Sequence, residues 1–113
     1  MIRRPRQQSP AHLAFLRALP SLVPGDGPVE AAHIRYADLR YFKPLTGLGE
    51  KPHDKFAVPL AASAHRDQHA GNERQWWANH AIDPILIAAL LWLHSGDIEA
   101  GEHIVRTARN WTR

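Results

Sequence analysis

Two histidines four residues apart, His65 and His69, constrain the fold of this 113-residue chain more than any other feature. Positions i and i+4 of an α-helix lie on one face, so a helix through residues 65–69 would present both imidazole rings on the same side. Two such rings can bind a single divalent metal ion. The alternative is a pair of solvated histidines, because the chain contains 8 histidines and some will fall four apart by chance.

Two short apolar segments precede this helix. Residues 29–34 and 56–60 have the length and composition of strands, and Pro59 predicts that the second strand lies at an edge or ends there. About twenty residues with several basic side chains separate the two segments. Loops of this length in small domains are usually functional or disordered, and the charges favour a binding loop over a merely solvated one.

The remaining segments are predicted to be helical. Ser9 followed by Pro10 is typical of a helix start, and Pro20 ends that first helix. Residues 20–28, here called the knuckle, are rich in proline and glycine and predict turns. Three later helices are predicted by their N-cap residues, which are Asn72, Asp83 and Asp97.

The predicted helix at residues 85–93 is apolar on every side. Such a helix must either be enclosed by its own fold or be covered by another chain. Because a chain of 113 residues has few elements to spare, we expect a two-fold homodimer through residues 85–93. The alternative is enclosure by the first helix, Trp76, Trp77 and the last helix.

Composition narrows the chemistry. The chain has no cysteine, which excludes disulfides, thiolate metal sites and cysteine nucleophiles, so any metal must be bound by histidine, carboxylate or water. A formal net charge of +3 and the arginines at residues 3–6 permit a polyanionic partner. No segment has the roughly 20 apolar residues of a membrane span or a signal-peptide core. We expect a cytoplasmic protein of a bacterium or phage.

In the order strand, long loop, strand and HxxxH helix, the chain resembles the HNH (His-Me finger) endonucleases. Within them it is most similar to the small phage and prophage group related to recombination-enhancement nucleases. The resemblance covers roughly residues 11–105 and depends on the order and spacing of several stretches. These stretches are residues 12–20, 30–38, 46–52, 58–60, 65–69, 72–74 and 96–101.

The resemblance implies an α+β fold. A ββα-metal finger, which is a short β-hairpin followed by the HxxxH helix, would be embedded among several α-helices. Residues 1–8 would form a disordered basic arm and residues 9–113 a single domain. The finger core would span residues 29–70, and residues 72–111 would form a mostly helical C-terminal part.

The resemblance also implies roles for individual residues. His33 would be the general base, and His65 and His69 would bind one divalent ion, which could be Mg, Mn, Ni or Zn. A free imidazole titrates near pH 6.5 and can therefore take a proton from water at physiological pH. The ion would stabilise the charge on the phosphorane and the leaving 3′ oxygen, giving a 5′-phosphate and a 3′-hydroxyl.

Other residues would complete the site. Asp54 or Asp38 is the candidate third metal ligand, with Glu30 as another source of an oxygen. Phosphate contacts are expected from basic residues near the site, namely Arg35, Arg40, Lys51 and Arg66.

The chain departs from the family pattern at several positions. Ala32 replaces a residue that often binds the metal, and the middle asparagine of the family name has no clear counterpart, with His53 and Asp54 lying nearest in sequence. Family members commonly hold a structural zinc on two CxxC pairs, which this chain cannot do. The corresponding positions here are Ser21, Pro24, Ala61 and Ala64. We therefore expect packing to hold the knuckle and folding to be independent of zinc.

The sequence thus predicts a metal-dependent HNH-like DNA endonuclease or nickase. One alternative is a catalytically silent HNH-like module that binds DNA or protein. Another is a protein in which His65 and His69 hold a metal for stability alone. Retention of His33 favours the enzyme, because neither alternative needs a general base. Packing or solvent roles are expected for His12, His80, His94, His103, Trp76 and Trp77.

Overall fold

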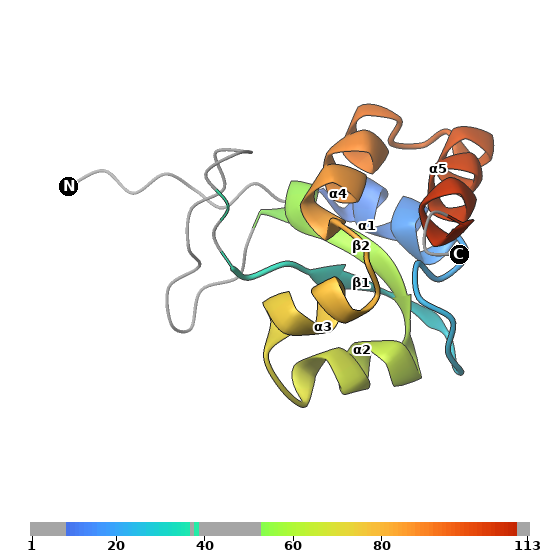
Figure 1. The fold of residues 1–113 in the computed structure, drawn as a ribbon. Coiled ribbons are helices and arrows are strands. Elements are labelled where there is room, and N and C mark those ends of the chain that lie inside the picture. The colour runs from blue at the N-terminus through green and yellow to red at the C-terminus, as the bar shows by residue number, and fades with distance from the viewer. Residues whose placement is uncertain (1–8, 37, 39–52, 111–113) are drawn as a thin grey trace.

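The fold is α+β, as predicted. The computed structural model describes residues 9–36, 38 and 53–110 (Figure 1). Its elements are α1 (Pro10–Arg17), β1 (Val29–His33), the 3-10 helix η2 (Asp54–Phe56), β2 (Ala57–Ala61), α2 (Ala62–His69), α3 (Glu73–Asn79), α4 (Pro84–Leu93) and α5 (Ile98–Asn110). The predicted basic arm, Arg40 and Lys51 lie outside the described residues.

β1 and β2 form an antiparallel hairpin in which Val29 faces Ala61 and His33 faces Ala57. β1 ends one residue before its predicted end, and β2 begins and ends one residue later than predicted. Phe56 belongs to η2, although its carbonyl still accepts a hydrogen bond from the backbone N–H of Ile34 at 2.8 Å. Pro59 lies inside β2, whose outer edge continues the pairing because the Pro59 carbonyl accepts the N–H of Leu22 at 2.9 Å.

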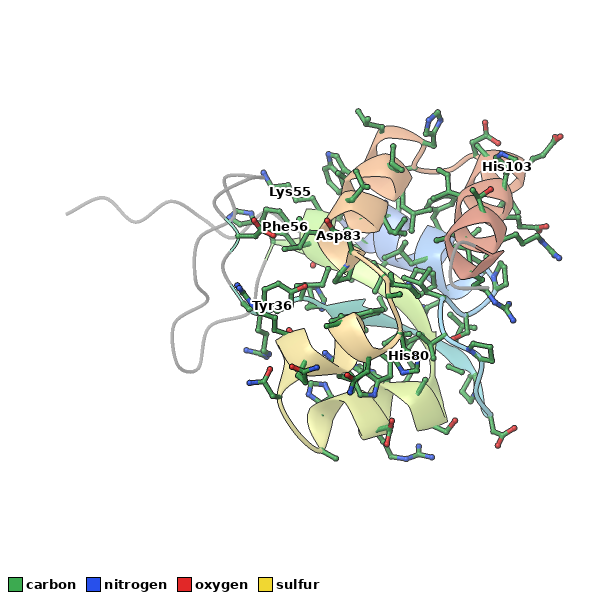
Figure 2. All side chains as sticks on the ribbon, in the orientation of Figure 1. Tyr36, Lys55, Phe56, His80, Asp83 and His103 are labelled. Carbon is green, nitrogen blue, oxygen red and sulfur yellow. The ribbon has the colours of Figure 1, made fainter. Side chains whose placement is uncertain are left out.

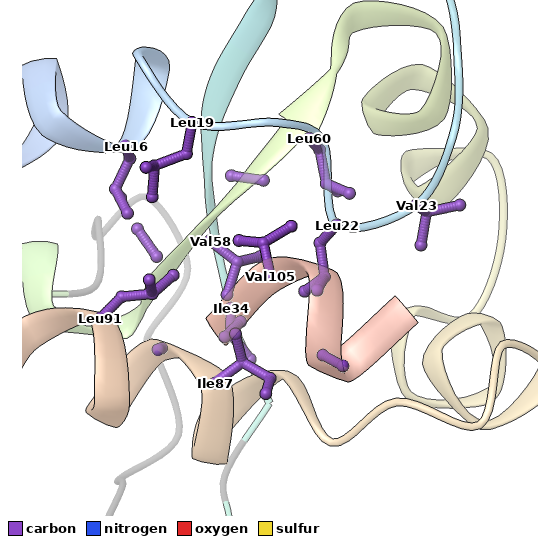
Figure 3. Packing of buried hydrophobic residues seen from close by; sticks show 14 of the residues in the cluster. Leu16, Leu19, Leu22, Val23, Ile34, Val58, Leu60, Ile87, Leu91 and Val105 are labelled. Atoms are coloured by element: carbon purple, nitrogen blue, oxygen red, sulfur yellow. The ribbon is translucent and has the colours of Figure 1, made fainter. Parts of the chain in front are cut away.

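Helices cover both faces of the hairpin. α1, α4 and α5 lie on one side, and α2 and α3 lie on the other (Figure 1). Every residue of β2 is buried, which explains why this strand is apolar without alternation. The side chains that fill the space between hairpin and helices are drawn in Figure 3 and include Leu16, Leu22, Val58, Leu60 and Leu91.

Local capping fixes where four of the helices begin. The side chain of each predicted N-cap residue accepts a backbone N–H from the first helical turn. The pairs are Ser9 with His12, Asn72 with Gln75, Asp83 with Leu86, and Asp97 with Ala100. α2 begins without such a cap, because it continues directly from β2.

Hydrogen bonds as well as packing hold the knuckle. The Ser21 hydroxyl donates to the carbonyl of Val23 and accepts the N–H of Ala61 at 2.7 Å. The Ser63 hydroxyl accepts the N–H of Asp26 at 2.7 Å, and the backbone of the same two residues pairs at 3.0 Å. A Cβ atom at Gly25 would lie 2.7 Å from the Ser63 hydroxyl, so only glycine permits this close approach.

α4 is only partly enclosed. Ile85, Ile87 and Leu91 are buried, whereas Leu93 is 77% exposed near the turn that leads to α5. The fold therefore leaves one side of this apolar helix open among the residues described. No helix in the described ranges has both the length and the apolar character needed to span a membrane.

Candidate metal and catalytic site

His65 and His69 face each other on α2. Their Nε2 atoms are 3.0 Å apart, and their ring centroids are 4.7 Å apart. The other ring nitrogen of His65, Nδ1, lies 2.9 Å from Oε1 of Glu30 on β1. The hairpin therefore contributes a carboxylate to the histidine pair, because α2 packs against β1.

The donor set fits a divalent metal. An ionised carboxylate only accepts hydrogen bonds, so Glu30 keeps the proton of His65 on Nδ1 and leaves the Nε2 lone pair for a ligand. Two nitrogens bound to one ion at about 2.1 Å lie about 3 Å apart when the angle at the ion is near 90°. The separation of 3.0 Å between the two Nε2 atoms matches this arrangement.

The histidine pair is not completed by a third residue of the described chain. Within residues 9–36, 38 and 53–110, no three histidine, aspartate or glutamate side chains are grouped so that they could hold one ion. The other coordination positions would then fall to water or substrate oxygens, as in catalytic sites that keep open positions.

His33, at the end of β1, belongs to a second cluster. Its Nε2 lies 2.9 Å from Oδ1 of Asp54, whose other oxygen accepts the backbone N–H of Ser9 at 2.6 Å. Asp54 is only 1% exposed, whereas the His33 side chain is 20% exposed. Because an ionised carboxylate only accepts hydrogen bonds, Nε2 carries the imidazole proton in this pair.

The structure thus assigns different surroundings to the predicted ligands. Asp54 lies against His33 and Ser9 and does not join a three-residue metal group, and Asp38 lines a separate pocket. Glu30 contacts the Nδ1 atom of His65. Arg35 and Arg66 are both exposed, as a phosphate-binding role requires.

Sequence reasoning missed Glu73. Its carboxylate accepts the backbone N–H of Arg35 at 2.8 Å and the side-chain amide of the buried Gln68 at 2.8 Å. It therefore ties α2 and α3 to the segment that leaves His33. A glutamate in the first turn of a capped helix is an ordinary helix-dipole residue, so the sequence carried no signal for this role.

The other histidines and the tryptophans have the expected packing and solvent roles. His12 is buried, with Nδ1 at 2.7 Å from the Ser95 hydroxyl, and Trp77 is buried in the core. His94 and His103 are exposed, while the ring of His80 lies 4.4 Å from that of the half-buried Trp76. Comparison of the chain with models of protein families, with curated proteins and with solved structures finds no match.

Proposed function

We propose that this protein is a metal-dependent, HNH-like DNA endonuclease or nickase that hydrolyses phosphodiester bonds with His33 as general base. The observation that carries the proposal is the pair of Nε2 atoms of His65 and His69, 3.0 Å apart, with Glu30 bound to Nδ1 of His65. Two solvated histidines on a helix have no need of a carboxylate that fixes their tautomer.

His33 and Asp54 perform the proton transfer in this proposal. The Nδ1 atom of His33 takes the proton of the attacking water, and Asp54 holds the ring and stabilises the imidazolium that forms. The N–H of Ser9 hydrogen-bonds the second oxygen of Asp54, so both oxygens of this buried carboxylate have a partner. The divalent ion bound by His65 and His69 supplies Lewis-acid stabilisation of the charge that develops on the phosphate.

The knuckle supports the same proposal. Ser21 and Ala61, two positions that correspond to zinc-binding cysteines in the family, are joined by a hydrogen bond. Gly25, which follows a third such position, lies against Ala61 and Ala64. Hydroxyl and backbone hydrogen bonds therefore occupy the region where a zinc ion would otherwise join the two segments.

Cleavage assays test the proposal. Purified protein should nick plasmid DNA or cleave single-stranded DNA with manganese, magnesium or nickel, and EDTA should stop the reaction. His33→Ala should lose at least 100-fold in rate while its manganese affinity, measured by calorimetry, changes less than about twofold, because the base is not a ligand. His65→Ala should lose both, and His103→Ala, on the exposed side of α5, should lose neither (Figure 2).

Two results would contradict parts of this scheme. A His33→Ala variant that cleaves as fast as the parent would show that His33 is not the base. Binding of DNA without cleavage under any of the three metals would instead identify a catalytically silent binding module.

A further inference from the structure

Glu73 joins the two parts of the proposed site. It is the first residue of α3, which lies beside α2 on one side of the hairpin (Figure 1). Its Oε1 atom accepts the backbone N–H of Arg35 at 2.8 Å, and its Oε2 atom accepts the side-chain amide of Gln68 at 2.8 Å. A single carboxylate therefore holds the backbone of the segment after β1 and a side chain of α2.

These two partners are close in sequence to the proposed base and to the proposed metal ligands. Arg35 follows His33, the last residue of β1, by two residues. Gln68 directly precedes His69 on α2 and follows His65 by three residues. Because side chains on a strand or helix are held more precisely than those on loops, fixing Arg35 and Gln68 also fixes the base relative to the histidine pair.

The burial of Gln68 indicates that its hydrogen bond matters. Gln68 is only 2% exposed, and its Oε1 atom has no hydrogen-bond partner within residues 9–36, 38 and 53–110. A buried polar atom without a partner is unfavourable, and an apolar side chain of similar size, such as methionine, would avoid that cost. Packing alone therefore favours an apolar residue here, and what the amide adds is the hydrogen bond to Glu73.

Other contacts attach α3 to its neighbours. The indole Nε1–H of Trp76 donates to Asp67 on α2 at 2.8 Å. The guanidinium carbon of Arg74 lies 4.8 Å from the centre of the Tyr36 ring, in the segment after β1. These contacts join side chains and should keep α3 in place when Glu73 is replaced. The hydrogen bond from Glu73, in contrast, holds the backbone of the segment itself.

We propose that Glu73 is a positioning residue of the nuclease that sets the distance between the general base and the bound metal ion. The proposal rests on the proposed function, because it needs His33 as the base and an ion at His65 and His69. The base and the ion act on the same phosphate, so both must lie at a fixed separation. A misplacement of about 1 Å is enough to lower a rate by about 100-fold.

Replacing Glu73 by alanine and by glutamine separates placement from charge. Glu73→Ala removes both hydrogen bonds and should lower kcat at least about tenfold, with KM and manganese affinity changed less than about threefold. Glu73→Gln keeps an oxygen for Arg35, and its NH₂ group can donate to Gln68 once the Gln68 amide turns over. Its kcat should therefore stay within about threefold of the parent. An equal loss in both variants would trace the effect to charge and overturn the proposal.

Glu99→Ala is the matched control. Glu99 is exposed in the first turn of α5, so this change removes the same kind of favourable charge at a helix N-terminus, away from the site. It should leave kcat unchanged.

Gln68→Met tests the other end of the link. The variant should fold, because it places an apolar side chain in a buried position, and its kcat should fall. The double variant with Glu73→Ala should be no slower than Glu73→Ala alone, since the link is then already broken. Losses that multiply in the double variant would show that the two residues act independently and would overturn the proposal.

Manganese bound at the histidine pair provides a measurement that does not depend on cleavage. The bound ion broadens the NMR signals of nearby amides, and the broadening falls steeply with distance. Glu73→Ala should change the broadening of the Arg35 amide by at least about 1.5-fold, as a displacement of about 1 Å would. The amide of His69 should keep the broadening of the parent, and Glu99→Ala should alter neither signal.

The outcomes separate the two proposals. Cleavage by Glu73→Ala at the rate of the parent, with unchanged broadening of the Arg35 amide, overturns the role of Glu73 and leaves the nuclease intact. Changed broadening in a protein that cleaves no substrate supports the link through Glu73 and overturns the nuclease. If manganese broadens no signal near α2, the metal site on which both proposals depend is overturned.

Discussion

Asp54 is a buried carboxylate that links two elements of the fold. Its two oxygens join the end of β1, through His33, to the start of α1, through the N–H of Ser9. A buried carboxylate is costly unless its hydrogen bonds are satisfied, and here both oxygens accept one. Asp54, one of the two residues nearest in sequence to the asparagine that the resemblance would require, thus contacts the proposed base.

Asp54→Asn should separate orientation from stability. The amide can keep the hydrogen bond to Ser9 through its oxygen, but its NH₂ group would then face His33 and donate to Nε2. The imidazole proton would move to Nδ1, and the base would be lost, as in catalytic triads with the same exchange. We expect cleavage to fall by about 100-fold with manganese affinity unchanged. Nitrogen-15 NMR of the His33 tautomer checks the cause; full activity with the proton still on Nε2 would contradict it.

His12 should make stability depend on pH. Burial lowers the pKa of this imidazole, and the nearby charge of Asp54 only partly opposes the effect. Below about pH 6.5 the unfolded chain binds a proton at His12 that the folded chain does not, so the free energy of unfolding falls as pH falls. The contribution is complete above about pH 7.5 and can change by at most about 1.4 kcal/mol per pH unit.

Urea unfolding at pH 7.5, 6.5 and 5.5 measures the slope of the free energy of unfolding against pH. His12→Phe should reduce it, whatever the overall stability of the variant, and His103→Ala should keep the slope of the parent because that side chain is exposed. Equal slopes in His12→Phe and the parent would show that His12 does not contribute.

For individual residues, the sequence predicted where side chains lie on an element better than it predicted their hydrogen-bond partners. The facing of His65 and His69 follows from helical spacing and was predictable. The contacts of Glu30 with His65 and of Asp54 with His33 were not, because they join residues 35 and 21 positions apart and depend on how the hairpin packs. Glu73 gave no signal at all, since its partner in the chain after β1 is a backbone N–H.

Among the helices and strands, the sequence predicted where helices begin, but it did not predict where strands end. An N-cap contact joins residues within one helical turn, so it can be predicted from the local sequence. This holds for the four N-caps Ser9, Asn72, Asp83 and Asp97. Strand ends depend on the partner strand, and η2 takes Phe56 out of the predicted second strand. At Asn72 only one half of a capping box forms, because the side chain of Gln75 donates to Asn79 and not back to the backbone of Asn72.

The stability of the knuckle should not depend on metal, but it should depend on the Ser21 hydroxyl. Exhaustive dialysis against chelator should leave the thermal midpoint within a few degrees, because the knuckle is held by Ser21, Ser63 and backbone hydrogen bonds. Ser21→Ala should destabilise the fold by about 1–3 kcal/mol, since it leaves the N–H of Ala61 and the carbonyl of Val23 without this partner. Loss of the far-UV circular dichroism signal on chelation would reveal a structural metal site.

At the scale of the molecule, the open side of α4 predicts self-association. Leu93, at the end of the apolar helix α4, is 77% exposed, and a two-fold axis would cover it with the same surface of a second copy. Light scattering at micromolar concentration should give about twice the 12.7 kDa of one chain, and Leu93→Glu should give folded monomers. A parent protein of 12.7 kDa would show that α4 needs no further cover.

Because β2 is buried on both faces, the hairpin depends on helices from other parts of the chain to cover it. Its apolar side chains pack with Leu16 from α1, Leu91 from α4 and Val105 from α5, so the cluster draws on both ends of the chain. A hairpin and HxxxH helix cut out at residues 29–70 would leave that surface in water. We therefore expect that residues 29–70 do not fold on their own. Their folding should require contacts with α1, α4 and α5, which are distant in sequence.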